Sequence, residues 1–373
     1  VLEEFLEKKS LYYDKIDYDV IKLSWTKLSE HITLPYVIHI VGTNGKGSTG
    51  RFLSSILHQL EQKVLHYSSP HILKFNERIW IDGQDVSDEN LQLAHEKLQT
   101  ILDDELLQKL TYFEYTTLLA LLLSDNLDYL VLEAGLGGEF DATNVVTNDL
   151  TIVTTIGLDH QNFLGDTVSL IAATKMRSCD KRYILANQIY DDVDDLKKEV
   201  LYSKEEISRN QYTLSEEATL LPIYLQNNLQ TALSVLEYLE FKDFIYTLPQ
   251  IKGRFERVSE NIIVDVGHNS LAAKVIAKEL ERENKKYILV YNSYADKDYK
   301  EVLTILKPFI SEVYIIECND KRMVDKNNLL KVLNDLALNV DDFDILKINS
   351  QNNYLVFGSF LVVENFMKGY SKK

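Results

Sequence analysis

The sequence predicts an α/β protein of two domains, each built on a mainly parallel β-sheet. From residue 36 onward, short apolar runs of strand length alternate with helical patterns, which is the order typical of β-α-β units. The 373 residues are enough for two domains, at roughly 150 residues each. The alternation breaks once, near residues 246–250, and then resumes. The predicted domains are therefore residues 1–246 and 247–373.

In the first predicted domain, a buried strand is followed by a helix with one apolar face. Residues 36–41 are the strand, and in residues 48–60 the apolar side chains recur at i, i+3 and i+4. Further strands are predicted at residues 64–67, 129–132, 150–156 and 183–186. The highly charged residues 191–217 are only weakly periodic, so a mobile excursion is predicted there.

The second predicted domain is smaller and Rossmann-like. It follows a helix around residues 229–239 and a hinge at residues 246–250. Its predicted strands are residues 262–266, 287–290, 313–316 and 354–357, and its predicted helices are residues 271–282, 299–307 and 328–338.

Composition excludes some classes of partner. A net charge of −17 argues against nucleic-acid binding, which needs a broad basic surface. No run approaches the ~20 apolar residues of a membrane span, and the acidic start at Val1 predicts no secretory signal. The two cysteines, Cys179 and Cys318, lie far apart, so a reduced, cytoplasmic setting is expected. We expect a monomer that acts on small molecules.

A glycine-rich segment lies between the first strand and its helix. Glycines let backbone N–H groups turn toward phosphate oxygens, and the helix N-terminus adds partial positive charge. The segment departs from the Walker A pattern, because Ile40 replaces the leading glycine and Gly47 follows the lysine. The alternative is a turn without a ligand, but the strand–loop–helix context favours a phosphate site. The predicted nucleotide-binding residues are Thr43, Asn44, Gly45, Lys46, Gly47, Ser48 and Thr49.

Acidic and histidine side chains follow two other predicted strands. Glu133 ends one strand, and Asp159 and His160 follow the next. Ligands of open α/β sheets bind beyond the carboxyl ends of the strands, where a carboxylate can hold Mg²⁺. Each residue alone could be a capping or core polar group. Their position beside a phosphate loop favours metal binding.

These motifs, taken together in their order, resemble the folylpolyglutamate synthase and dihydrofolate synthase group of the Mur ligase superfamily. The likeness runs from about Tyr36 to about Asp298. The motifs are Gly42–Ser48, Ser68-Ser69-Pro70-His71, Glu77-Arg78-Ile79, Thr111-Tyr112-Phe113-Glu114, Glu133 with Gly135-Leu136-Gly137-Gly138, Asp141-Ala142-Thr143-Asn144, Asp159-His160, Gly253-Arg254, Asp265 with His268-Asn269, and Asp296-Lys297-Asp298.

The resemblance implies an ATP-binding central domain of the P-loop Mur ligase type and a Rossmann-like C-terminal domain. It implies ATP and Mg²⁺, the latter as two ions. The residues it implicates are Lys46, His160 and Lys175 in catalysis; Ser69, Glu133, His160 and Lys175 at the metals; Asn227, Arg254, Asp265 and His268 at the nucleotide; and Phe113, Asp141 and Asp296 at the substrate. Lys175 falls where the family has a lysine that can be carbamylated.

The sequence also departs from the family pattern. Glu139 replaces the usual Arg after the double glycine, which changes the expected substrate contacts there. The usual Glu-Lys-Ala-Gly is Thr174-Lys175-Met176-Arg177, the usual Pro-Gly-Arg is Lys252-Gly253-Arg254, and the usual Asp-Gly-Ala-His is Asp265-Val266-Gly267-His268.

The implied activity is ATP-dependent ligation of glutamate to dihydropteroate, to reduced folate, or to both, through an acyl phosphate. Metal ions and Lys46 would stabilise charge on the transferred phosphoryl group. His160 could instead act as a general base, and His268 could make a nucleotide contact or a structural hydrogen bond. The alternatives for the whole protein are a peptidoglycan-type Mur ligase and a nucleotide-binding regulator that has lost ligase activity.

Overall fold

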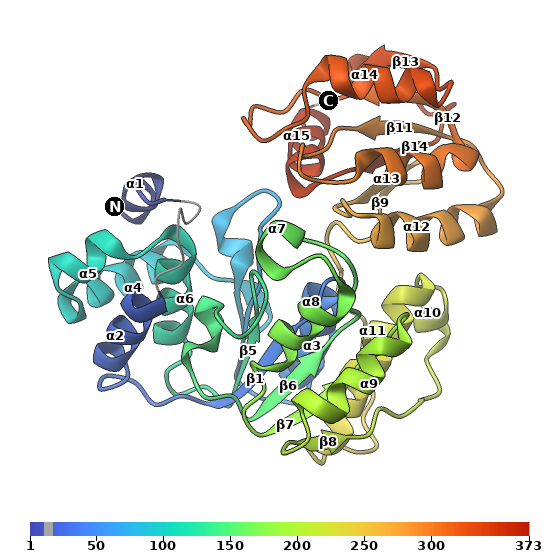
Figure 1. The fold of residues 1–373 in the computed structure, drawn as a ribbon. Helices are drawn as coiled ribbons and strands as arrows, with labels where there is room; N and C mark the ends of the chain where they lie inside the picture. Colours follow the sequence, from blue (N-terminus) through green and yellow to red (C-terminus); the bar gives the residue numbers. More distant parts are fainter. Residues whose placement is uncertain (11–17, 373) are drawn as a thin grey trace. The chain divides into compact units, whose positions relative to one another are not determined.

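Two mainly parallel sheets organise the chain, one in each of two units (Figure 1). The computed structural model describes residues 1–10 and 18–372. The first unit contains Val1–His71, Phe75–Leu221 and Leu225–Pro249, and the second contains Ile72–Lys74, Pro222–Tyr224 and Gln250–Lys373. The predicted α/β class is confirmed, with parallel pairing in the centre of both sheets.

The sheet of the first unit has eight strands in the order β4-β3-β2-β5-β1-β6-β7-β8. Pairing is parallel from β2 through to β8, and β3 and β4 add an antiparallel edge. The strands are β1 (Tyr36–Val41), β2 (Val64–Tyr67), β3 (Ile79–Ile81), β4 (Gln84–Asp85), β5 (Tyr129–Glu133), β6 (Leu150–Val153), β7 (Arg182–Leu185) and β8 (Glu205–Ile207).

Helices accompany these strands as the alternating sequence pattern requires. They are α1 (Leu2–Glu7), α2 (Tyr18–Leu28), α3 (Lys46–Gln59), α4 (Asp88–Ile101), α5 (Asp104–Lys109), α6 (Tyr112–Leu123), α7 (Gln161–Leu164), α8 (Val168–Met176), α9 (Asp191–Val200), α10 (Glu216–Thr219) and α11 (Ile223–Tyr238), with 3₁₀ turns η1 (Phe75–Arg78) and η2 (Ala142–Val145). Side chains on a strand alternate between faces. Accordingly, His66 of β2 contacts Gly50 of α3, whereas Tyr67 packs with α6.

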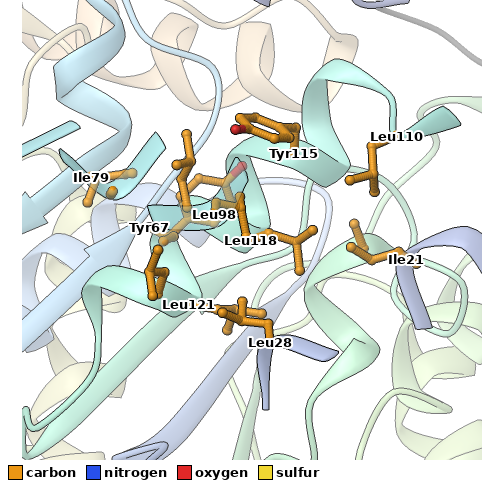
Figure 2. Packing of buried hydrophobic residues seen from close by; sticks show 14 of the residues in the cluster. Ile21, Leu28, Tyr67, Ile79, Leu98, Leu110, Tyr115, Leu118 and Leu121 are labelled. Atoms are coloured by element: carbon orange, nitrogen blue, oxygen red, sulfur yellow. The ribbon is translucent and has the colours of Figure 1, made fainter. Parts of the chain in front are cut away.

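The largest described core cluster of the first unit joins helices α1, α2, α4, α5 and α6 to the sheet (Figure 2). Helix α6 is apolar on nearly every side, and residues 114–122 are all buried. Its N-terminus is fixed by a capping box, in which Thr111 and Glu114 exchange hydrogen bonds between side chain and backbone. Helices that are hydrophobic all round are buried all round, so α6 is the centre of this layer.

Removing a side chain from this cluster is expected to destabilise the fold. Leu118 of α6 is fully buried. Leu118→Ala should lower the free energy of unfolding by about 2–5 kcal/mol, through lost burial and a residual cavity. Urea denaturation measures the change, with the exposed Leu93→Ala of α4 as the matched control. A loss for Leu118→Ala no larger than that of the control would contradict this account of the core.

The prediction of a mobile excursion at residues 191–217 is wrong. This segment forms α9, the edge strand β8 and α10, and β8 pairs in parallel with β7. Val193 of α9 is fully buried, whereas most of the charged residues of α9 are exposed. The abundance of charge therefore marks a solvated face of an ordered helix.

The sheet of the second unit has six strands in the order β13-β12-β11-β14-β10-β9, of which only β9 pairs in an antiparallel manner. Helices α12 to α14 pack on one face and α15 on the other. The elements are β9 (Glu256–Ser259), β10 (Ile262–Asp265), α12 (Ser270–Glu283), β11 (Tyr287–Tyr291), α13 (Tyr299–Leu306), η3 (Lys307–Phe309), β12 (Ile310–Ile315), α14 (Lys326–Asp335), β13 (Val340–Asp342), η4 (Ile345–Lys347), β14 (Tyr354–Phe357) and α15 (Phe360–Tyr370).

Within residues 1–10 and 18–372, no helix has the length and apolar character that a transmembrane span requires.

Candidate active site

The glycine-rich loop joins β1 to α3 in a backbone conformation that only glycine adopts easily. Gly42 has φ +150°, and a Cβ there would lie 1.8 Å from Thr154 Oγ1. Gly45 has φ +91° and occupies the N-cap of α3. L-residues with side chains rarely adopt these angles. The loop thus presents the N-terminus of a 14-residue helix, α3, at the carboxyl end of the central strand.

The segment after β6 holds this loop in place. Backbone N–H groups of Thr43 and Asn44 donate to the Thr155 carbonyl at 3.0 and 3.1 Å. The Thr43 hydroxyl donates to the Gly157 carbonyl at 3.0 Å and accepts from the Gly157 N–H at 3.0 Å. These contacts explain why β6 ends at Val153, earlier than the predicted residue 156. Beyond Val153, the Thr154 N–H still donates to the Val41 carbonyl of β1 at 2.8 Å, and the Thr155 carbonyl then accepts from the loop.

Lys46, Glu133 and Ser69 meet beside the loop. Lys46 Nζ lies 3.9 Å from Glu133 Oε1, and the Ser69 N–H donates to Glu133 Oε2 at 3.4 Å. Glu133 is the last residue of β5 and is buried. A Cβ at Gly47 would lie 3.2 Å from Glu133 Oε2, so the glycine gives the carboxylate room at the start of α3.

Lys175 of α8 lies against the same loop. It is buried, and its Nζ donates to the Gly42 carbonyl at 2.9 Å. Burial, with a smaller contribution from the nearby Lys46 charge, lowers the pKa of Lys175 from its ordinary 10.5 to about 7, and Asp159 and Asp141 oppose the shift. A large fraction of this amine is therefore neutral and nucleophilic near pH 7.

His160, unlike the buried Glu133 and Lys175, lies on the protein surface. It is exposed, has a left-handed backbone with φ +51°, and precedes α7. Its N–H donates to the Asp159 carboxylate at 2.8 Å. In the part of the chain that the structure describes, no three His, Cys, Asp or Glu side chains are grouped closely enough to hold a metal ion.

The donor set at Glu133 fits a hard cation. A buried carboxylate beside a serine supplies oxygen ligands, which Mg²⁺ prefers, and Mg²⁺ usually completes its shell with water and substrate phosphates. Such a site needs only one or two protein carboxylates. The grouping of Glu133 and Ser69 at the phosphate loop meets this requirement without a cluster of three acidic or histidine side chains.

The two substrate candidates of the first unit differ in their surroundings. Phe113 of α6 is half-buried, and its ring lies against Gly135 and 5.9 Å from the Tyr67 ring centroid. Asp141 is buried, and its carboxylate accepts from the Leu136 N–H at 2.7 Å and from the Thr143 N–H and hydroxyl at 3.0 and 2.6 Å. These hydrogen bonds hold the turn after β5 in its conformation, so Asp141 stabilises this turn.

Asp265 anchors the predicted residues of the second unit. Its buried carboxylate accepts from the N–H groups of Gly267 and Phe255 at 2.7 and 2.8 Å, and from the Tyr224 hydroxyl at 3.2 Å. Burial raises the pKa of Asp265, while the Arg254 charge lowers it. His268 Nδ1 lies 3.2 Å from the Val266 carbonyl oxygen.

Asp296, the remaining candidate of this unit, is about half exposed. Its carboxylate lies 3.8 Å from the ammonium of Lys297, whose side chain is only 7% exposed.

Asn228, which was not among the predicted site residues, contacts the glycine-rich loop and the start of α3. Its Nδ2 donates to Ser48 Oγ at 2.7 Å, and a Cβ on Gly45 would lie 2.9 Å from its Oδ1. The predicted residue Asn227 is one position away on α11 and accepts instead from Asn187 at 3.1 Å. In the sequence the two asparagines are adjacent and cannot be told apart by type. The hydrogen bond to Ser48 identifies Asn228 as the one that points toward the loop.

Known proteins resemble this chain over most of its length. It is 32% identical to a Haemophilus influenzae protein named dihydrofolate synthase/folylpolyglutamate synthase, over 97% of this chain and 95% of the relative. A crystal structure of Helicobacter pylori folylpolyglutamate synthetase matches with a TM-score of 0.77 and 37% identity, over 100% of this chain and 98% of that one.

A third match has ligands in its description. It is a crystal structure of a bifunctional folylpolyglutamate synthase/dihydrofolate synthase with Mn, AMPPNP and L-glutamate bound, and it gives a TM-score of 0.83 at 26% identity, over 99% of this chain and 97% of that one. No protein-family model matches the sequence.

Proposed function

The chain belongs to the dihydrofolate synthase/folylpolyglutamate synthase family, and from this premise we propose how its own residues perform the reaction. It is an ATP-dependent ligase that joins L-glutamate to dihydropteroate or to the γ-carboxyl group of a reduced folate. We propose that this chain accepts both. The observation that carries the assignment of the site is the convergence of Lys46, Glu133 and Lys175 on one phosphate loop.

The reaction requires that a carboxylate be made susceptible to attack by an amine. We propose that the ATP γ-phosphoryl group passes to the acceptor carboxylate, and that the glutamate amine then attacks the acyl carbon and releases phosphate. Gly45, Lys46, Gly47, Ser48 and Thr49 at the start of α3 hold the phosphates, with Thr43 and Asn44 shaping the loop. The Lys46 ammonium neutralises charge on the transferred group.

A divalent cation supplies Lewis-acid stabilisation of the phosphate oxygens when it is bound. We propose that Glu133 and Ser69 hold it, because the Glu133 carboxylate lies beside Lys46 and Gly47 of the loop and accepts a hydrogen bond from the Ser69 N–H. His160, exposed at the start of α7, is the proposed second-site ligand together with Lys175. The number of ions, two, is part of this proposal.

We propose that Lys175 is carbamylated in the active enzyme. The reaction is attack of the neutral ε-amine on CO₂, with loss of one proton, and it converts a cation into a carboxylate-like metal ligand. A pKa of about 7 makes the neutral amine abundant enough for this chemistry. The Gly42 carbonyl at 2.9 Å fixes the position of the amine beside the glycine-rich loop.

The remaining residue roles rest on the family resemblance. We propose that Phe113 contacts the aromatic part of the acceptor, since its half-buried ring is held against Gly135. Arg254, Asp265 and His268 are proposed nucleotide residues, and Asp296 is a proposed substrate residue. Asp141 is proposed to act by shaping the turn from residues 136 to 143.

Measuring ADP release with ATP, Mg²⁺ and glutamate tests this function. We expect turnover with dihydropteroate and with tetrahydrofolate, supplied in separate reactions, and none when glutamate is omitted. Turnover with only one acceptor would overturn the bifunctional proposal. ATP binding without turnover on either acceptor would favour a different Mur-type substrate or a regulator.

Asn228 and Asn227 provide a matched pair for testing the nucleotide site. Asn228→Ala removes a buried hydrogen bond to Ser48 and the packing of the Asn228 amide against Gly45. A hydrogen bond of this kind is worth about 1 kcal/mol, so the Kd for a non-hydrolysable ATP analogue should rise about fivefold. Asn227→Ala should change the same Kd less than twofold. Calorimetric titration measures both, and the reverse ranking would refute the choice of Asn228.

A further inference from the structure

The turn after β5 packs directly on the backbone of Lys175. The Glu139 N–H donates to the Thr174 carbonyl at 2.9 Å. A Cβ at Gly138 would lie 2.9 Å from the Lys175 carbonyl oxygen and 3.0 Å from its Cα. The turn and α8 therefore touch backbone to backbone, and a shift of one moves the other.

An ion pair spans the same contact. Arg177 follows α8 as its C-cap, and its guanidinium Nη1 lies 3.3 Å from Glu139 Oε2. The Glu139 side chain is 30% exposed and that of Arg177 is 53% exposed. The carboxylate is thus directed toward α8, two residues beyond Lys175.

Two departures from the family pattern are therefore a single interaction. Glu139 and Arg177, both named above as departures from the resembling motifs, contact each other directly. The pair forms where a negative side chain on the turn meets a positive one on the helix. The Glu139 carboxylate therefore has a partner within the protein, and a contact with substrate is not required to account for its negative charge.

We propose that Glu139 and Arg177 are positioning residues, which hold the turn after β5 against α8 and so fix where Lys175 meets the phosphate loop. This inference rests on the proposed role of Lys175. Exposed ion pairs contribute little to global stability. A displacement of about 1 Å at reacting groups can lower a rate about a hundredfold. The expected signature is a large change in kcat with a small change in Tm.

Charge reversal tests the proposal. Glu139→Arg places two cations at the contact, and Arg177→Glu places two anions there. We expect each single variant to lose about tenfold or more in kcat, with the KM of the acceptor changed less than about twofold. The double variant Glu139→Arg/Arg177→Glu restores the pair with opposite polarity, and its kcat should return to within about threefold of wild type.

The control is an exposed pair of similar type in the same unit. Arg182 Nε lies 2.6 Å from Glu205 Oε2 where β7 meets β8. Arg182→Glu, Glu205→Arg and their double variant should leave kcat within about twofold of wild type. Equal losses in the control set, or no recovery in the Glu139→Arg/Arg177→Glu double variant, would overturn the proposal. A rise in acceptor KM without recovery would make Glu139 a substrate contact.

Hydrogen exchange separates this inference from the proposed function. The residue-139 amide donates to Thr174, so Arg177→Glu should accelerate its exchange about tenfold in nucleotide-free protein. The double variant should return the exchange rate toward that of wild type. If the exchange rate of this amide is unchanged in Arg177→Glu, the ion pair does not hold the turn against α8, and the proposal fails whatever the activity of the variant. Absent turnover in the wild-type protein would instead refute the proposed function.

Discussion

Lys46→Met is expected to lower kcat about a thousandfold while the protein still folds. Lys46 is the cation at the phosphate loop, 3.9 Å from Glu133 and within 3.4 Å of the Gly42 and Thr43 carbonyls. Charge spreads over the phosphoryl oxygens as the group transfers. Removing one preorganised cationic donor from such a site costs about 10²–10³ in rate or more.

Steady-state ADP release measures this loss, and thermal unfolding reports the integrity of the fold. Methionine retains the length and apolar stem of lysine, so α3 should form normally. Lys63→Met, an exposed lysine just before β2 in the same unit, is the matched control and should leave kcat unchanged. If Lys46→Met retained more than about a tenth of the wild-type kcat, Lys46 would not be the main stabiliser of the phosphoryl group.

Lys175→Ala is expected to lower kcat at least about a hundredfold. The substitution removes both the buried amine beside Gly42 and the metal ligand that carbamylation would create. Losing a ligand of a metal that stabilises the transferred group removes several kcal/mol of transition-state stabilisation. Small carboxylic acids such as formate, added to Lys175→Ala, should restore part of the activity if a carboxylate is the missing group.

The pH and CO₂ dependence of the wild-type enzyme test carbamylation directly. With a pKa of about 7, Lys175 is mostly an ammonium below pH 7 and mostly a neutral amine above it. CO₂ reacts only with the neutral amine, so activation by added bicarbonate should rise as pH increases through about 7. Intact mass measured at high pH should show one added CO₂, absent in Lys175→Ala.

Activity that is independent of bicarbonate at every pH, with no added mass, would contradict the carbamylation proposal. Failure of formate to rescue Lys175→Ala would then assign the loss to the amine itself. In that case the Lys175 ammonium, and not a carbamate, would be the group that acts beside the phosphates.

The local pattern of the sequence determined the central elements of the fold. Residues 36–41, 64–67 and 354–357 form strands with the predicted bounds. They are predominantly apolar runs, in which His39 and His66 are also buried, as expected for strands covered on both faces of a parallel sheet. The glycine-rich loop was recognisable from the sequence because its glycines stand between a strand and a helix, and Gly42 and Gly45 adopt positive φ angles that favour glycine.

The charge pattern and the helical phase do not indicate packing partners that are distant in the chain. Residues 191–217 looked like a mobile excursion because their apolar positions are few, yet the buried Val193, with the partly buried Leu196 and Val200, packs α9 against the core. Between Asn227 and Asn228, the residue toward the loop is set by the rotation of α11 on the sheet. The sequence pattern does not determine how far α11 is rotated about its own axis.

What the sequence determined by itself is therefore the family, the glycine-rich loop between β1 and α3, and the strands that precede each candidate residue. Only the tertiary structure decided that Lys175 meets Gly42 across 133 positions of chain, that Glu139 pairs with Arg177, and that Asp141 accepts a hydrogen bond from the Leu136 N–H. Periodicity reports which face of an element is buried. The desolvation that shifts a pKa and the pairing of remote charges depend on strand order and register, which bring those faces together.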